Sequence, residues 1–285
     1  MREGVLEVRD GRNVAYGEFG DSAGTPVLVC HGSAESRLLE IEPEWTAERG
    51  VRVVTPDRPG FGQSDPLSGR TVLGWATDAE DVVDALGIDH FTVLGWSGGG
   101  PHALATALAL GDRVDAIALI GSFAPIPLVP GAYDALSPAM QVLADLAPSD
   151  PAGAAALVTE VAKEWVADPE TFSLGGESPP ADVAIEAHPV WGANLRAQVH
   201  EGLRRTDGVA WDATALFATW GFDVAAIRQR ADVWHGRSDS VMPFRNGEWL
   251  AGTMPNAELH PIDGAHFIVF SHWREIVASL VDHAG

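Results

Sequence analysis

The sequence predicts an α/β fold in which helices cover both faces of a parallel sheet. Apolar strands alternate with helical segments over the first 124 residues and again after residue 225. These strands are apolar at nearly every position, which is typical of parallel strands buried on both faces. In addition, a glycine-rich turn at 95–100 joins one strand directly to a helix, an arrangement that places a side chain at a sheet edge.

The chain is expected to open with a hairpin, because Asp10-Gly11 separates two short alternating segments. A helix is expected over 72–86, where apolar residues recur at helical spacing. The single cysteine, Cys30, lies in an apolar run and is interpreted as a small core residue. The strands expected before the glycine-rich turn are 5–9, 14–19, 27–30, 51–55 and 91–94.

The pattern of the second half predicts a helical insertion within the sheet domain. The glycine-rich turn is followed by a helix over 99–110, with Pro101 in its first turn, and by a strand at 114–120. From residue 125 onward, about a hundred residues contain helical stretches but no convincing apolar strand. The elements expected there and beyond are helices at 152–165, 183–205, 243–251 and 267–281 and strands at 231–234 and 258–261. The expected division is a core in two parts, 1–124 and 226–285, with a helical cap at 125–225 between them.

Charge limits the partners of this protein. The 285 residues carry a formal net charge of −22, and residues 125–225 contribute −10 of it through 14 acidic and 4 basic side chains. Nucleic acids and anionic membranes would be repelled by such a surface, so we expect a small-molecule substrate, no nucleic acid and no membrane partner. The sequence has no apolar leader and no long apolar span, which predicts a cytoplasmic protein, as a monomer or homodimer.

Ser97 is the candidate nucleophile. It stands in Gly95-Trp96-Ser97-Gly98-Gly99, between an expected strand and an expected helix. A serine on such a sharp turn projects its hydroxyl from the sheet edge, and the neighbouring glycines relieve crowding around it. The N-terminus of the following helix presents free N–H groups to the same point, where an oxyanion would develop.

A serine nucleophile needs a base, and the base needs an acid to orient it. His266 follows the last expected strand on a turn of small residues, which places its imidazole at the same sheet edge as Ser97. Asp239 follows the preceding strand and is the expected acid. Asp57 and Asp65 precede the serine and are interpreted as residues that organise their loop.

Two backbone N–H groups are expected to form an oxyanion hole. Gly98, which follows the nucleophile, supplies the first, and the loop after strand 27–30 supplies the second. We assign the second to Ser33, with Ala34 as the alternative. Trp96 and Ala34 are expected to contact substrate, although a place in the core explains Trp96 equally well.

These motifs together resemble those of the α/β-hydrolase-fold enzymes that carry a helical cap. The likeness covers nearly the whole chain and rests on the segments 31–32, 57–64, 95–99, 236–239 and 264–266. The resemblance implies an eight-stranded, mostly parallel sheet with the cap inserted after the sixth strand. It also implies catalysis through an acyl-enzyme with no cofactor. Separately, no metal site is expected, and the single cysteine excludes a zinc cluster built on cysteines.

The same segments depart from several subfamilies of this fold. Proline iminopeptidases usually have H-G-G-P-G at the oxyanion loop, where this chain has His31-Gly32-Ser33-Ala34-Glu35. Epoxide hydrolases and haloalkane dehalogenases use an aspartate nucleophile, where this chain has Ser97. The cofactor-free haloperoxidases usually carry an aromatic residue at the position of Ser33. The motifs therefore specify the superfamily and leave the substrate open.

The leading hypothesis is a serine hydrolase of carboxylic esters with small, largely apolar groups. The alternative is an aminopeptidase or amidase, because Glu160, Glu164 and Asp168 would line one helix face and bind an ammonium group. A solvated helix face explains those three acids equally well. Hydrolysis of a carbon–carbon bond by the same residues also stays open, as does, with less support, a non-catalytic ligand receptor.

Overall fold

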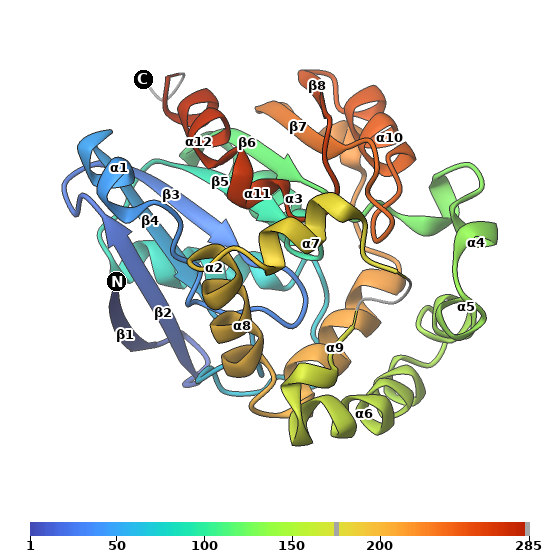
Figure 1. Ribbon diagram of the computed structural model, residues 1–285. Helices are drawn as coiled ribbons and strands as arrows, with labels where there is room; N and C mark the ends of the chain where they lie inside the picture. Colours follow the sequence, from blue (N-terminus) through green and yellow to red (C-terminus); the bar gives the residue numbers. More distant parts are fainter. Residues whose placement is uncertain (174–176, 283–285) are drawn as a thin grey trace.

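An eight-stranded sheet runs through the computed structural model, which describes residues 1–173 and 177–282 (Figure 1). The strands are β1 (Arg2–Glu7), β2 (Asn13–Gly20), β3 (Thr25–Cys30), β4 (Val51–Pro56), β5 (Phe91–Trp96), β6 (Val114–Ile120), β7 (Arg230–Gly236) and β8 (Ala257–Ile262). Their order across the sheet is β1-β2-β4-β3-β5-β6-β7-β8. β2 is antiparallel to both of its neighbours, and the other pairs are parallel. The predicted fold class is confirmed, including the opening hairpin.

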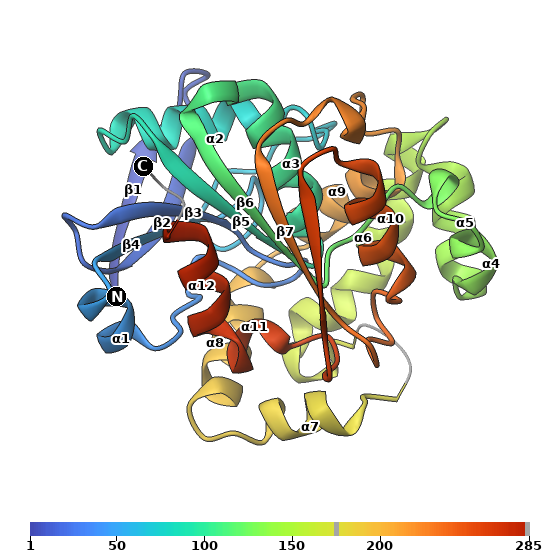
Figure 2. The same cartoon turned by 90° about the horizontal axis from the view of Figure 1, so that it is seen from above.

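Helices cover both faces of this sheet. They are α1 (Pro43–Glu48), α2 (Trp75–Ala85), α3 (Gly99–Leu110), α10 (Arg245–Thr253), α11 (Ile268–Ser271) and α12 (Trp273–Val281). Figure 2 shows α2 and α3 on one face and α1 and α12 on the other. Val93 belongs to the apolar core beneath α3, whereas its neighbour Leu94 belongs to the core beneath α12. Successive strand residues point to opposite faces, so β5 must be apolar throughout.

Another set of helices lies between β6 and β7, the position predicted for the cap. They are α4 (Ala132–Ala135), α5 (Pro138–Leu146), α6 (Pro151–Ala167), α7 (Pro180–Glu186), α8 (Trp191–Gly202) and α9 (Thr206–Phe217), here called the α4–α9 segment. Within it, α6 and α9 pack side by side (Figure 1). The described residues of this stretch contain no strand, as expected, while the domain boundaries at 125 and 225 stay predictions.

Two of the predicted helices are interrupted in the structure. The helix predicted over 183–205 is divided, because α7 ends at Glu186 and α8 begins at Trp191, with Pro189 between them. Proline lacks the N–H that would continue α7, and it disfavours helical backbone at the residue before it. The closing helix predicted over 267–281 is divided at His272, whose φ of −121° is not helical.

The remaining elements are short 3-10 helices that join the larger ones. They are Gly111–Arg113, Ile126–Leu128, Pro169–Thr171 and Val224–Ala226. Across 1–173 and 177–282, no helix combines the length and the apolar character needed to cross a bilayer. Cys30 is fully buried, as predicted, and burial raises the pKa of its thiol to about 12.

Candidate active site

Ser97 occupies the sharp turn between β5 and α3. Its backbone φ is +54°, a left-handed conformation that costs free energy for any residue with a Cβ. The turn is fixed on both sides, because the Ser97 N–H donates to Ile120 O (2.9 Å) and Ser97 O accepts from the Gly100 N–H (3.1 Å). The strained turn therefore holds the serine hydroxyl at the carboxyl end of the parallel strands.

Two glycines allow α3 to approach the sheet this closely. A Cβ on Gly99 would lie 1.9 Å from the carbonyl oxygen of Cys30, and one on Gly100 would lie 1.8 Å from Ser122 Oγ. Neither the backbone nor the buried hydroxyl can withdraw far enough to admit a side chain. Both positions therefore require glycine, for packing as well as for the turn itself.

The three residues predicted for nucleophile, base and acid meet at this turn. His266 Nε2 lies 2.9 Å from Ser97 Oγ, and His266 Nδ1 lies 2.9 Å from Asp239 Oδ2. The other carboxylate oxygen of Asp239 accepts the N–H groups of Val241 (2.9 Å) and Met242 (2.8 Å), which fixes the carboxylate plane. Because Nδ1 faces a carboxylate, the ring proton belongs on Nδ1, and Nε2 is left to accept the serine proton.

The charge around His266 favours its protonated form. Burial lowers the pKa of the imidazole, but Asp239 raises it, and Glu35 and Asp182 raise it further. The net result is a pKa above the ordinary value of 6.5. A base must be unprotonated to act, so activity that depends on His266 is lost as the pH falls through this raised pKa.

The loop after β3 brings Ser33 against the turn. A Cβ on Gly98 would lie 2.2 Å from Ser33 Oγ, so the two predicted oxyanion donors belong to adjacent backbone segments. The carbonyl of Gly32 is held by His31 Nδ1 (2.8 Å) and Arg58 Nη2 (3.2 Å). Peptide bonds here are trans, so the Ser33 N–H points away from Arg58. No acceptor for the N–H of Ser33 or Gly98 occurs within 1–173 and 177–282.

A buried carboxylate with two arginine partners holds the loop after β3 in place. Asp212, on α9, accepts from Arg58 Nε (2.9 Å) and Nη2 (2.8 Å) and from Arg70 Nη2 (2.8 Å). It also accepts the hydroxyl proton of Ser33 (2.9 Å). Burial raises the pKa of Asp212, but Arg58 and Arg70 outweigh burial and hold the pKa well below its usual range. Asp212 thus stays ionised and ties the α4–α9 segment to the loop that carries Ser33.

Asp182, on α7, connects the α4–α9 segment to a second loop, the one that carries His266. Its Oδ2 accepts the N–H of His266 (3.0 Å), and its Oδ1 accepts the N–H of Phe267 (2.9 Å). Burial raises the pKa of this carboxyl group, although the two N–H donors lower it. Sequence reasoning missed Asp182, because its position in the chain carries no signal of a contact 84 residues away.

Asp182→Asn is expected to lower kcat for any reaction that uses His266 as its base by about 10- to 100-fold, because misplacing His266 by a fraction of an ångström is costly. An amide can accept only one of the two N–H groups and turns a donor toward the other. The variant also removes a charge that raises the pKa of His266. The acid limb of the kcat/KM profile should therefore move to lower pH.

The check on this prediction is the pH profile of both proteins, with Glu177→Gln as the control. Glu177 is exposed and lies just before α7, so its removal should leave the acid limb in place. A purely structural role for Asp182 would lower the amount of folded enzyme without moving the limb, and that result would contradict the prediction.

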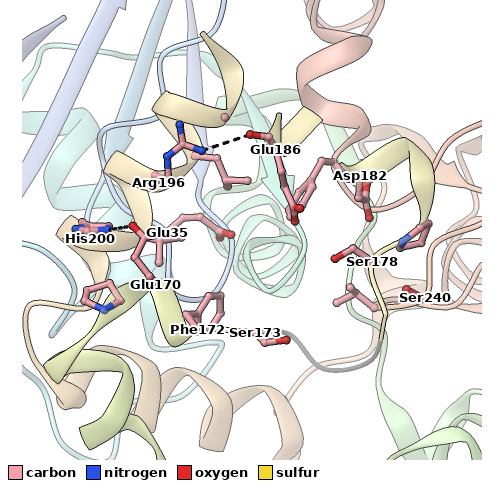
Figure 3. Close-up of a pocket in the computed structure, with 17 residues that line it drawn as sticks. Glu35, Glu170, Phe172, Ser173, Ser178, Asp182, Glu186, Arg196, His200 and Ser240 are labelled. Atoms are coloured by element: carbon pink, nitrogen blue, oxygen red, sulfur yellow. Dashed lines mark hydrogen bonds and ion pairs between the residues drawn. The ribbon is translucent and has the colours of Figure 1, made fainter. Parts of the chain in front are cut away.

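A cavity of about 340 Å³ lies between the α4–α9 segment and the loops that follow β3, β7 and β8 (Figure 3). Neither Ser97 nor His266 lines it, but Phe267, which follows His266, does. Phe267 and Asp182 line it on the side of the His266 loop, and Glu35 lines it on the side of the oxyanion loop. Its other charged lining residues are Glu170, Glu186, Arg196 and His200. His200 pairs with Glu170 (2.7 Å), and Arg196 donates to the carbonyl of Glu186 (3.3 Å).

Two predicted substrate contacts do not reach this cavity. Trp96 is fully buried and packs against Phe267 and Phe270, with ring centroids 6.0 and 5.7 Å apart. Ala34 is also fully buried, in an apolar cluster with Phe61. Because both side chains are enclosed within apolar clusters, their assignment to substrate binding is corrected: both are packing residues.

The acidic helix face also lies elsewhere. Glu160, Glu164 and Asp168 are exposed and line no part of the cavity. Glu160 pairs with Lys163 (2.6 Å) on the surface of α6. These three acids therefore form a solvated surface, and they do not provide an ammonium site beside the cavity.

Outside this region, Asp232, Glu258 and His260 place one possible metal-ligand atom each within 4.8 Å of one another on β7 and β8. Asp232 already accepts from His260 Nε2 (2.9 Å) and Arg230 Nη2 (3.3 Å). Contacts within the protein therefore account for this cluster, which lies within strands β7 and β8 and not at the turn that carries Ser97.

The doubly covered sheet, with a serine on the turn between its fifth strand and the next helix, defines an α/β hydrolase. The family described as the alpha/beta hydrolase fold matches residues 25–272, and the chain belongs to this family.

Its relatives span several activities. It is 29% identical to the 2-hydroxymuconate semialdehyde hydrolase of Pseudomonas putida, over 89% of this chain and 82% of that protein. It is 26% identical to the non-heme chloroperoxidase of Streptomyces lividans, over 94% and 95%. Among solved structures, an esterase from Exiguobacterium antarcticum superposes with a TM-score of 0.69 at 21% identity, over 98% and 97% of the two chains. These likenesses establish the α/β-hydrolase fold. They do not identify the bond that this protein cleaves.

Proposed function

We propose that this protein is a serine hydrolase that cleaves carboxylic esters of small, largely apolar substrates through an acyl-enzyme. The observation that carries the proposal is the chain of contacts from Ser97 through His266 to Asp239, each link 2.9 Å long. Such a chain raises the nucleophilicity of a serine that is otherwise inert near neutral pH. We also propose that Ser33 and Gly98 donate the two N–H groups of the oxyanion hole.

In the first half of the reaction, Ser97 Oγ attacks the ester carbonyl carbon while its proton passes to His266 Nε2. The carbonyl oxygen becomes an oxyanion, which accepts the N–H groups of Ser33 and Gly98. Each such donor lowers the barrier by about 3–4 kcal/mol. The imidazolium, stabilised by Asp239, then gives its proton to the leaving alcohol, and the acyl group remains on Ser97.

In the second half, a water molecule takes the place of the alcohol. His266 accepts its proton as the hydroxyl attacks the acyl carbon, and the same oxyanion donors stabilise the second tetrahedral intermediate. Collapse returns the proton to Ser97 Oγ and releases the carboxylic acid. The α4–α9 segment, as a cap over the cavity, would exclude bulk water and shape the acyl site.

The test is hydrolysis of p-nitrophenyl esters from acetate to octanoate, together with labelling by a fluorophosphonate. We expect turnover that depends on chain length, and a label found by mass spectrometry on the peptide that contains Ser97. Labelling without ester turnover would indicate that the protein cleaves another type of bond. No labelling would mean that the nucleophile is not activated, and the protein would then be a ligand receptor.

Cleavage of a carbon–carbon bond is the second candidate, favoured by the likeness to the 2-hydroxymuconate semialdehyde hydrolase. A muconate semialdehyde carries a carboxylate, which needs a cation in its site. The cavity offers Arg196 and His200 against four carboxyl groups, so it is better matched to esters without a free carboxylate. Loss of absorbance of 2-hydroxymuconate semialdehyde on addition of the protein would support the second candidate against the first.

The net charge of −22 supports the remaining proposals about partners. We propose a small-molecule substrate, with no role for nucleic acid or an anionic membrane, because both would be repelled. A monomer or homodimer, a cytoplasmic location and catalysis without a cofactor or metal remain predictions from the sequence.

A further inference from the structure

Glu35 has an unmet hydrogen-bonding capacity at the edge of the cavity. It follows the oxyanion loop, is only 3% exposed, and lines the cavity beside Asp182 and Phe267. Its Oε2 has no hydrogen-bond partner among the described residues. This oxygen lies so close to Gly32 that a Cβ there would meet it at 2.0 Å, so the carboxyl group cannot turn away in that direction. A buried polar atom of this kind calls for a partner from the ligand.

Charged groups on several neighbouring elements affect the pKa of Glu35. Burial raises the pKa of Glu35 to about 8, against the opposing effect of His266 and Arg58, while Asp212 adds to the rise. Across the cavity, burial and then the charge of Asp182 raise the pKa of Glu186 as well. These carboxyl groups therefore share a site that disfavours their ionised forms. A cation bound among them would reverse that penalty.

The basic groups of the cavity do not supply this cation. His200 is engaged by Glu170, and Arg196 donates to the carbonyl of Glu186. The net charge of −22 would also raise the local concentration of cationic molecules around the protein. The charges of the cavity and the unpartnered oxygen thus agree on the chemistry of the missing group: a cation that can donate a hydrogen bond.

We propose that the cavity binds a substrate ammonium group through Glu35, so that the preferred substrates are esters with a protonated amine next to the acyl carbonyl. This inference rests on the proposed ester hydrolysis and names the substrate class for that site. The ammonium donates one N–H to Glu35 Oε2, and the proximity of Glu35 to the oxyanion loop sets the amine beside the carbonyl. When Glu35 carries a proton before binding, that proton leaves to solvent as the ammonium enters.

The test compares two esters that differ in one group, benzyl glycinate and benzyl propionate, in which an ammonium replaces a methyl. At neutral pH we expect the wild type to hydrolyse the glycinate with a kcat/KM at least about tenfold higher, the effect of one hydrogen bond to a charged group. Glu35→Gln should reduce this preference by about tenfold. The ratio of the two kcat/KM values is compared within each protein, so an effect of Glu35 on His266, which acts on both esters alike, cancels. Measurable turnover of the propionate also shows that the variant is folded.

Glu170→Gln is the matched control, because Glu170 lines the same cavity but has His200 as its partner. It should retain most of the preference for the glycinate. An equal preference in wild type and Glu35→Gln, or a wild type that favours the propionate, would overturn the ammonium site. In that case Glu35 acts as a neutral hydrogen-bond donor or as a packing group.

Binding to Ser97→Ala, measured by calorimetry, separates this inference from the proposed function. Tighter binding of the glycinate than of the propionate, lost in Ser97→Ala/Glu35→Gln, supports the ammonium site even if neither ester is hydrolysed. Fluorophosphonate labelling of the wild type with no difference in binding between the two esters overturns the ammonium site and leaves the serine hydrolase intact.

Discussion

Ser97→Ala is expected to lower kcat for ester hydrolysis by about 10⁴- to 10⁶-fold, because removing the nucleophile removes the acyl-enzyme route altogether. The proposed oxyanion donors and the cavity remain, so some hydrolysis by bound water should persist above the solution rate. The measurement is kcat for p-nitrophenyl butyrate, with Ser271→Ala as the control, because Ser271 is exposed on α11. More than about one per cent of wild-type kcat in the purified variant would place the nucleophile elsewhere.

The same variant tests whether Ser97, His266 and Asp239 act as one unit. Asp239→Asn alone is expected to lower kcat by about 10⁴-fold, because an amide stabilises the wrong tautomer of the imidazole. Added to Ser97→Ala, it should change the residual rate by less than about tenfold, since the pathway it serves is already gone. Additive losses would show that Asp239 acts through a route that does not involve Ser97.

Asp212→Asn is expected to lower the free energy of unfolding by about 3–5 kcal/mol, because Arg58 and Arg70 would remain buried without a counter-charge. Arg58 is fully buried and Arg70 nearly so, so water cannot replace the carboxylate. At about 2–4 °C of Tm per kcal/mol for a domain of this size, the loss corresponds to roughly 6–20 °C. Calorimetry or thermal unfolding followed by circular dichroism measures it.

The control for this variant is Glu160→Gln, which removes an acid from the exposed ion pair with Lys163. Exposed pairs contribute little, so its effect should stay below about 1 kcal/mol. Equal and small losses in the two variants would mean that solvent reaches the arginines. Because Asp212 also binds Ser33, the folded fraction of Asp212→Asn should in addition show a reduced kcat.

The sequence was sufficient to place the residues that follow strands of the sheet. Ser97, Asp239 and His266 follow β5, β7 and β8, and parallel strands deliver their following residues to one edge of the sheet. Asp57 was also predicted correctly as a loop organiser, since it accepts the N–H groups of Arg37 (2.6 Å) and Gln63 (3.2 Å). In these cases, position along the chain already determines position in space.

Residues that reach the site from the α4–α9 segment were not predictable in the same way. Asp182 and Asp212 meet their partners over 84 and up to 179 residues of sequence, and no periodicity encodes how this segment docks. A lone acid within the apolar run 209–217 was the one available sign that Asp212 is buried and paired.

Trp96 shows the opposite error. Its place beside the nucleophile suggested a substrate contact, but the alternation of β5 turns its side chain into the core beneath α12. Trp96 and Ser97 are therefore neighbours in sequence, but their side chains point to different sides of the strand. Helix α1 was also absent from the prediction, because its six residues are too few to show a helical period.

The contact between Asp182 and the His266 loop ties the placement of α7 to the alignment of the imidazole. If α7 were displaced, two backbone N–H groups would lose their acceptors, and the imidazole would lose its support beside Ser97. The docking of the α4–α9 segment and the geometry of the base therefore depend on the same carboxylate, which itself takes no part in the chemistry.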